Sequence, residues 1–545
     1  MTVLPRQLVT VLMTPLTVLV LAVAGTVITP DWNPPRLPPQ LAYPALPPAP
    51  ATQPIPSGVP VRAEDTSIAV DGDTLATTIY TPAEPGRYPA VVFVHGGGPG
   101  KRDAFAGQAE QLARAGIVSL VYDKRTNGYS VFQRDYAQLA ADALVAVRLL
   151  RDRPDVDPAR VGLWGISEGG WVVAIGASDP AGGVAFAIMV SAAATSPLRQ
   201  STWALDTGLR RLGASGGASR AAVRAFGVGG FGYVRHDAEP ALRRLNVPVL
   251  AIHGTDDRAV PPVESPRLIT RYLEESGNRR YTVRFFGGAG HDLRVGGQLA
   301  PGYLETMAGW VRGLPGTAGS DPQVAGATPA QEYLSAEAPS IGRIGVLALL
   351  AAYLLIAAGY LAAPAYALAG RLRRRTVPST SAPASASASA PASVSASAPA
   401  SASALTPAPA PASAPVPVPV SALAPASVSG SASVPASAWP GLRLRRRLRW
   451  LIVSGLATVI AINAFLGTIV TLAIAGSKAG WIASTGWIAI QALAVLTAGL
   501  FVSTLVFVTS ARPWRASTTI ERVRLAGVST ATTMVLLLAA YWITG

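Results

Sequence analysis

Long apolar runs and segments of mixed polarity alternate along this chain, and they predict two kinds of structure. Five runs are long enough to cross the hydrocarbon core of a bilayer, which takes about 20 helical residues. The runs are 8–29, 341–369, 450–476, 481–510 and about 525–543, and we expect transmembrane helices in the last four.

The first run admits two interpretations. Ala22-Val23-Ala24 has the small-residue pattern of a signal-peptide cleavage site, but the apolar run continues through Ile28 and only Arg6 precedes it. We favour an uncleaved anchor over residues 1–29, with a removable signal peptide as the alternative. Either interpretation carries the following residues out of the cytoplasm.

Short β-branched or aromatic runs alternate with helix-like segments between residues 60 and 313. Asp71-Gly72-Asp73 predicts the turn of an entry hairpin, and 195–240 is expected to form a small cap. Alternation of this kind predicts an α/β fold, a mostly parallel sheet with helices on both faces and active-site loops at the carboxyl ends of its strands. The remaining predicted strands are 90–95, 117–122, 161–165, 184–190, 247–253 and 281–286, and the clearest helices are 136–151 and 262–276.

Two segments follow neither pattern. Residues 30–60 are rich in proline and predict an extended spacer. Residues 376–440 are almost wholly Ala, Ser, Pro and Val. Because such a segment has no large side chains to bury, we expect a disordered linker there.

The distribution of charge predicts topology rather than a nucleic-acid partner. The 545 residues carry a net charge of +15, but residues 60–313 hold 28 Lys or Arg against 25 Asp or Glu. Most of the excess lies in arginine-rich groups at 371–375, 443–449 and 512–524, each beside an apolar run. Positive flanks mark cytoplasmic ends. We therefore expect a multi-pass protein of the cell membrane, surrounded by membrane lipid, with residues 30–340 outside the cytoplasm.

The segment Gly165-Ile166-Ser167-Glu168-Gly169 carries the strongest chemical signal. It has the form Gly-x-Ser-x-Gly and joins a predicted strand to a predicted helix, a tight turn that lifts the serine hydroxyl clear of the sheet. A second match, Gly213-Ala214-Ser215-Gly216-Gly217, follows no strand. Context therefore favours Ser167 over Ser215 as a nucleophile.

Three other loops follow predicted strands and supply the partners of a nucleophilic serine. His95-Gly96-Gly97-Gly98 can direct N–H groups at an oxyanion. Asp257 offers an acid and His291 a base, so the order is Ser, Asp, His. His95 and His253 stand at strand ends before glycine, where we expect them to brace loops by hydrogen bonding.

These motifs together resemble the α/β-hydrolase superfamily, most closely its dienelactone-hydrolase-like and prolyl-oligopeptidase-like members, over about residues 60–313. Thr126-Asn127-Gly128 departs from the Arg-Gly-x-Gly of many relatives. The resemblance does not extend to the C-terminal membrane region, which stays unassigned. The resemblance rests on His95-Gly96-Gly97-Gly98, Tyr122-Asp123-Lys124-Arg125, Gly165-x-Ser167-x-Gly169, His253-Gly254-x-x-Asp257-x-x-Val260-Pro261 and Gly290-His291.

The resemblance implies a serine hydrolase with an acyl-enzyme mechanism and without a cofactor or metal. Ser167 would attack a carbonyl carbon, His291 would take its proton and Asp257 would orient the imidazole. In relatives the acid stands four residues after the histidine of His-Gly, which fits Asp257 and not Asp256. The oxyanion hole would be the backbone N–H of Glu168 with one from Gly97 or Gly98.

The resemblance constrains the substrate class less than it constrains the mechanism. Carboxylic esters are favoured, and small peptides or amides are the alternative, as in a prolyl-oligopeptidase-like peptidase. A non-catalytic hydrolase fold that senses a ligand for the membrane half is a third possibility.

Two charged clusters are expected to be structural. Asp123-Lys124-Arg125 is interpreted as an ion-pair cluster rather than a binding site. The arginines of the predicted cap are interpreted as a solvated face, with recognition of acidic substrates as the alternative; they are Arg210, Arg211, Arg220 and Arg224.

Overall fold

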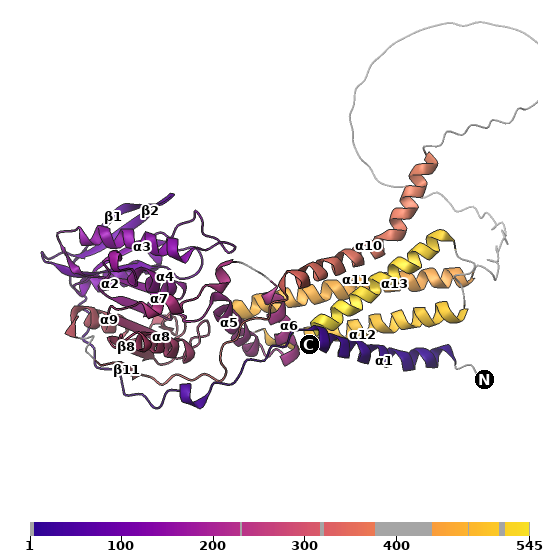
Figure 1. The fold of residues 1–545 in the computed structure, drawn as a ribbon, viewed down its shortest axis with the longest axis horizontal. Coiled ribbons are helices and arrows are strands. Elements are labelled where there is room, and N and C mark those ends of the chain that lie inside the picture. The colour runs from indigo at the N-terminus through magenta and orange to yellow at the C-terminus, as the bar shows by residue number, and fades with distance from the viewer. Residues whose placement is uncertain are drawn as a thin grey trace, which may run out of the picture.

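The protein consists of an α/β unit and a bundle of long helices, with the short helices α5 and α6 between them (Figure 1). The computed structural model describes residues 5–228, 232–316, 321–375, 439–477, 479–511 and 518–543. The linker predicted over 376–440 lies outside the described residues apart from its last two positions.

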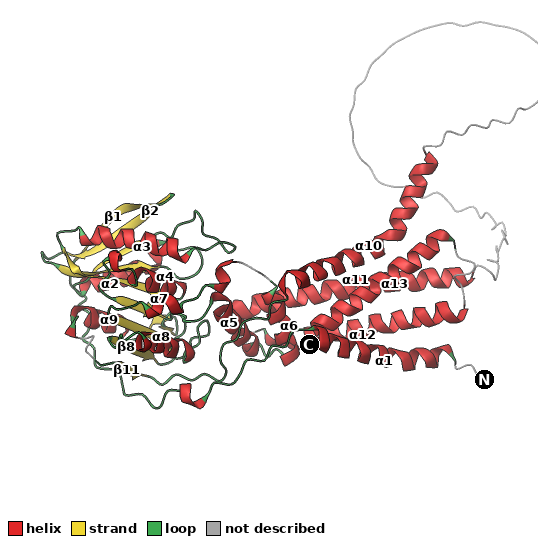
Figure 2. Ribbon diagram, viewed as in Figure 1, coloured by secondary structure: helices red, strands yellow, loops and turns green. Residues whose placement is uncertain are grey.

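The α/β unit is built on one nine-stranded sheet of order β1-β2-β4-β3-β5-β6-β7-β8-β11 (Figure 2). β1 and β2 form the predicted hairpin, β2 also runs antiparallel to β4, and all other neighbours are parallel. The prediction of a mostly parallel sheet is confirmed. The strands are β1 (Val61–Val70), β2 (Asp73–Pro82), β3 (Tyr88–Val94), β4 (Val118–Tyr122), β5 (Val156–Ile166), β6 (Ala187–Val190), β7 (Val249–Gly254), β8 (Tyr281–Phe286) and β11 (Gln323–Gly326).

Helices cover both faces of the sheet because successive strand residues point to opposite sides. On β3, Val92 joins a core with residues of α3 (Tyr136–Arg151), α4 (Glu168–Ala177) and α8 (Glu264–Glu275). Its neighbours Val91 and Phe93 join a second core with residues of α2 (Ala106–Arg114) and α9 (Tyr303–Arg312). A strand buried on both faces is continuously apolar, which is how the central strands read in the sequence.

The proline-rich segment 30–60, for which an extended spacer was expected, lies along the α/β unit. Gly326 N–H donates to Pro47 O at 2.9 Å, and Leu334 N–H donates to Pro35 O at 2.8 Å. Prolines lack a backbone N–H but keep an acceptor carbonyl, so such a segment can still accept bonds from a neighbouring strand. The partner is a region that includes β11, which lies beyond the domain boundary expected at 313.

The predicted membrane region contains five helices that are long and apolar enough to cross a membrane. Three of them extend beyond the predicted apolar runs, because arginine-containing flanks at 371–375, 443–449 and 519–524 are helical as well. The helices are α1 (Arg6–Ile28), α10 (Gly342–Arg375), α11 (Trp439–Ile474), α12 (Gly480–Ala511) and α13 (Thr519–Ile543).

The cap comprises α5 (Pro197–Arg211) and α6 (Gly216–Gly227), whereas the short α7 (Glu239–Arg243) packs against α4 and α8 in the core of the α/β unit. Apolar residues of α5 and α6, such as Leu209 and Ala222, share one buried cluster with residues of α11, α12 and α13. The cap therefore forms the junction between the two parts of the molecule.

This junction overturns the expectation of a solvated arginine face for one of the four residues. Arg224 is 1% exposed and donates to the carbonyl of Trp542 at the end of α13. A cation there neutralises the negative end of the helix dipole. The sequence pattern did not reveal this burial because the partner helix lies more than 300 residues away.

Candidate active site

Ser167 lies in a strained turn between β5 and α4. Its φ is 55° and its ψ is −118°, a conformation that non-glycine residues seldom adopt and that costs about 1–3 kcal/mol. Gly169 permits the turn, because a Cβ there would lie 2.7 Å from the carbonyl oxygen of Val94. The result is the strand–turn–helix geometry that exposes a nucleophilic serine.

Asp257 and His291 meet across the ends of β7 and β8. The carboxylate oxygens of Asp257 lie 3.0 and 3.1 Å from His291 Nδ1. Asp257 is buried, and its Oδ1 also accepts the backbone N–H groups of Ala259 and Val260. Burial lowers the pKa of His291, but the charge and hydrogen bond of Asp257 outweigh it, so that the pKa of His291 is raised above 6.5.

The adjacent carboxylate has a different environment. Asp256 is exposed and its backbone N–H donates to Ala289 O at 2.9 Å.

No hydrogen bond joins Ser167 Oγ to His291 in the described part of the chain, although both residues line one cavity. Such catalytic hydrogen bonds are often long before substrate binds.

The two other histidines at strand ends, His95 and His253, differ in their hydrogen bonding. His95 Nε2 lies 2.6 Å from the carbonyl oxygen of Tyr122, so it braces the loop as expected. His253 is fully buried and neither ring nitrogen finds a hydrogen-bond partner among the described residues, so the same expectation is wrong for this residue. Burial lowers the pKa of each to about 4.

Ser215, the second Gly-x-Ser-x-Gly match, is a helix cap. Its side chain accepts the backbone N–H of Ala218 at the start of α6, and its φ of −63° is ordinary. Serine is a favoured residue at this position for that reason.

One hydrogen bond decides which of the two glycine N–H groups is available for the expected oxyanion hole. Gly98 N–H donates to the hydroxyl of Tyr129 at 2.9 Å, so it already has a partner. Gly97 lines the cavity beside Ser167 and is left as the available donor from this loop. Glu168 opens α4, where backbone N–H groups are free of helical partners and the helix dipole favours negative charge.

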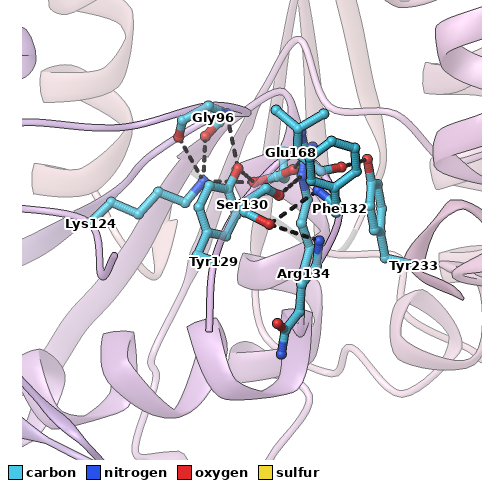
Figure 3. A network of polar contacts seen from close by, with 11 residues as sticks. Gly96, Lys124, Tyr129, Ser130, Phe132, Arg134, Glu168 and Tyr233 are labelled. Atoms are coloured by element: carbon cyan, nitrogen blue, oxygen red, sulfur yellow. Dashed lines mark hydrogen bonds and ion pairs between the residues drawn. The ribbon is translucent and has the colours of Figure 1, made fainter. Parts of the chain in front are cut away.

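A buried polar network holds the loop 96–98 against α4 (Figure 3). The Glu168 carboxylate accepts from Lys124 Nζ and from Tyr129 OH, each at 2.7 Å, and it is also paired with Arg134. Lys124 Nζ donates in addition to the carbonyl of Gly96 at 2.7 Å. The Glu168 side chain was not predicted to matter.

The ion-pair interpretation of Asp123-Lys124-Arg125 is confirmed, and each member has its own partner. Asp123 accepts from Lys101 at 2.7 Å, and Arg125 forms a two-pronged pair with Asp142. Burial lowers the pKa of Lys124 to about 8, while the nearby Glu168 carboxylate acts in the opposite direction.

Four of the candidate residues, Gly97, Ser167, Glu168 and His291, line a cavity of about 690 Å³. Pro197, Leu198 and Leu205 of α5 contribute to the lining from the cap. Three residues at the end of α11 and just after it complete the wall, namely Ala473, Ile474 and Gly476.

Residues 105–314 match the model of the prolyl oligopeptidase family. An uncharacterized protein of Mycobacterium tuberculosis, MT2364, is 30% identical over 287 residues, which are 51% of this chain and 88% of that one. Esterase EstD of Thermotoga maritima is 36% identical over 107 residues, 18% of this chain and 26% of that one.

Among solved structures, a dienelactone hydrolase of Anabaena variabilis aligns at a TM-score of 0.30 and 20% identity, over 46% of this chain and 94% of that one. The sheet topology, the strained serine turn and the family match agree with one another. The chain belongs to the α/β-hydrolase superfamily and is a serine hydrolase.

Proposed function

We propose that Ser167, His291 and Asp257 form the catalytic triad of a carboxylic ester hydrolase. The observation that carries the proposal is the pair between Asp257 and His291 Nδ1 beside a strained serine that lines the same cavity. His291 Nδ1 donates to the buried carboxylate, so Nε2 is left to accept the Ser167 proton.

The reaction then follows from these positions. Ser167 Oγ attacks the ester carbonyl carbon as His291 takes its proton, and the backbone N–H groups of Glu168 and Gly97 hold the oxyanion. Each such donor is worth about 3–4 kcal/mol in the transition state. The imidazolium protonates the leaving alcohol, and water, activated by His291, hydrolyses the acyl-enzyme.

The similarity to an esterase of Thermotoga maritima supports esters as the substrates. The cavity lining holds two carboxylates: Glu168 is buried and paired with Lys124 and Arg134, whereas Asp256 is exposed. Amide cleavage stays the alternative, supported by the prolyl oligopeptidase family match.

Labelling with a fluorophosphonate probe tests the nucleophile. The wild-type chain should be labelled at one serine, Ser167→Ala should abolish labelling, and Ser215→Ala should retain it. Labelling that persists in Ser167→Ala would refute the triad. A matched panel of ester and anilide substrates then measures the preference for esters.

We also propose that the five apolar helices tether the enzyme to the cell membrane, with the hydrolase unit outside the cytoplasm. The arginines of 371–375 and 443–449 lie at the ends of α10 and α11 remote from the cap, which supports this orientation. Reporter fusions should report residue 320 outside and residue 410 inside. Cleavage within 376–440 by a protease added to intact spheroplasts would overturn the orientation.

A further inference from the structure

The catalytic cavity is not closed by the hydrolase unit alone. Part of its wall comes from Ala473 and Ile474 at the end of α11 and from Gly476 in the turn that leads to α12. The end of a helix that is long and apolar enough to cross a membrane thus borders the space in front of Ser167.

The cap is held tightly against that helix end. A Cβ on Gly208 of α5 would lie 2.5 Å from the carbonyl oxygen of Ala473, and one on Gly217 of α6 would lie 2.9 Å from the ring of Trp487. At both positions a side chain larger than that of glycine would meet its neighbour, so the cap packs directly on α11 and α12. Gly208 and Ala473 both line the cavity, and their contact is therefore part of its wall.

The surfaces on either side of this wall are apolar. Leu198, Ala204 and Leu205 line the cavity from the cap. Ile474 is 69% exposed at the end of α11, and Trp481 at the start of α12 is 71% exposed. Exposed tryptophans are enriched where a helix leaves the hydrocarbon core for the interface.

The exposed charged side chains of the lining are Arg211, Asp256 and Arg258. They complement the polar part of a molecule whose other part is a hydrocarbon chain. A water-soluble short ester would leave the apolar surfaces of α5 and α11 uncovered.

We infer that the substrate is an amphiphilic ester with a long acyl chain, taken from the outer leaflet beside α11. Its acyl chain lies in the cavity, against the apolar residues that α5 and the end of α11 contribute to the lining, and its carbonyl reaches Ser167. The inference rests on the proposed triad and orientation, which it extends to a substrate class.

Chain-length dependence tests the acyl site in the full-length protein. The ratio of kcat/KM for p-nitrophenyl dodecanoate to that for p-nitrophenyl butyrate should exceed about tenfold, since each buried methylene is worth about fourfold. Ile474→Trp, and separately Ala204→Phe from the cap side, should lower that ratio at least about tenfold. Val27→Trp, at an equally exposed apolar position outside the cavity lining, should leave it unchanged.

Delivery from the membrane needs a second measurement. A dodecanoyl umbelliferyl ester placed in the same phosphatidylcholine vesicles as the protein should be hydrolysed at least about tenfold faster than the same ester in separate vesicles. Equal rates would overturn delivery from the leaflet.

Different results would overturn the acyl site and the serine hydrolase itself. A chain-length ratio near one, or equal ratios in all four proteins, overturns the acyl site while fluorophosphonate labelling at Ser167 still supports the hydrolase. Absence of labelling at Ser167 in the wild-type chain overturns the proposed function itself.

Discussion

The hydrolase unit and the helix bundle bury their apolar residues in opposite ways. Strand residues such as Val92 and Leu163 are completely buried within the protein. In the bundle, only 6% of the most apolar stretch of α1 and 44% of that of α13 are buried. The hydrolase unit is thus complete as a folded core, whereas the helices present apolar surface for which lipid is the matching solvent.

The ion pairs of the two regions also differ in burial. The hydrolase unit buries whole ion pairs, such as Lys124 with Glu168, beside its candidate active site. In the bundle, the pair between Arg445 and Glu521 lies at the arginine-rich end and is partly exposed. The comparison teaches that precise geometry is held by the hydrolase unit and that the bundle contributes position and one wall of the cavity.

The largest effect is expected from removing the acid that orients His291. Asp257→Asn should lower kcat/KM about 10⁴-fold, because the imidazole loses its orienting partner. Asn keeps an oxygen for the N–H groups of Ala259 and Val260, so the fold should persist. Asp256→Asn, the adjacent control, should lose less than about tenfold on the same ester, and the reverse ranking would move the acid to Asp256.

The pH profile adds a second readout of the same pair. His291 must be neutral to accept a proton, and its pKa is raised above 6.5 because Asp257 outweighs burial. In the wild-type enzyme, kcat/KM should therefore fall about tenfold per unit as the pH drops below that raised value. In Asp257→Asn, burial still lowers the pKa of His291 and the carboxylate no longer raises it, so the fall of kcat/KM should begin at a lower pH. A fall at the same pH in both proteins would show that the pair with Asp257 does not determine the pH dependence.

A smaller effect is expected from opening the buried network under the oxyanion loop. Lys124→Met removes a partner of Glu168 and should destabilise the fold by about 3–5 kcal/mol, as when one member of a buried pair is lost. Lys101→Met removes an ion pair of similar length, but the Lys101 side chain is 75% exposed, so about 0–1 kcal/mol is expected. Denaturant unfolding measures both, and equal losses would contradict the role of burial.

The smallest effect concerns the junction itself. Gly208→Ala should lower stability by about 1–3 kcal/mol, because its Cβ meets the backbone of Ala473. Gly309→Ala is the matched control, since this helical glycine has open space around its Cβ and should gain up to about 1 kcal/mol. Thermal unfolding should show shifts of opposite sign. A shift of the same sign in both would argue against tight contact between cap and bundle.

The local features of this protein could be predicted because the residues that determine them are neighbours in sequence. The strand over 281–286 was predicted at the bounds at which β8 is observed, and the helix over 136–151 coincides with α3. Alternating burial and the glycines beside Ser167 act within a few residues, so periodicity and turn chemistry were sufficient.

What could not be predicted depends on residues that only the folded chain brings together. Glu168 and Lys124 are 44 positions apart, and Arg224 and Trp542 are 318 apart. The N–H of Gly98 donates to Tyr129, so Gly97 is the available oxyanion donor of this loop. This difference depends on the path of a loop that no periodic pattern describes. The sequence by itself determined the sheet, the serine turn and the apolar helices. Tertiary packing decided which helix end borders the active site, because close contact depends on backbone approach and not on residue type.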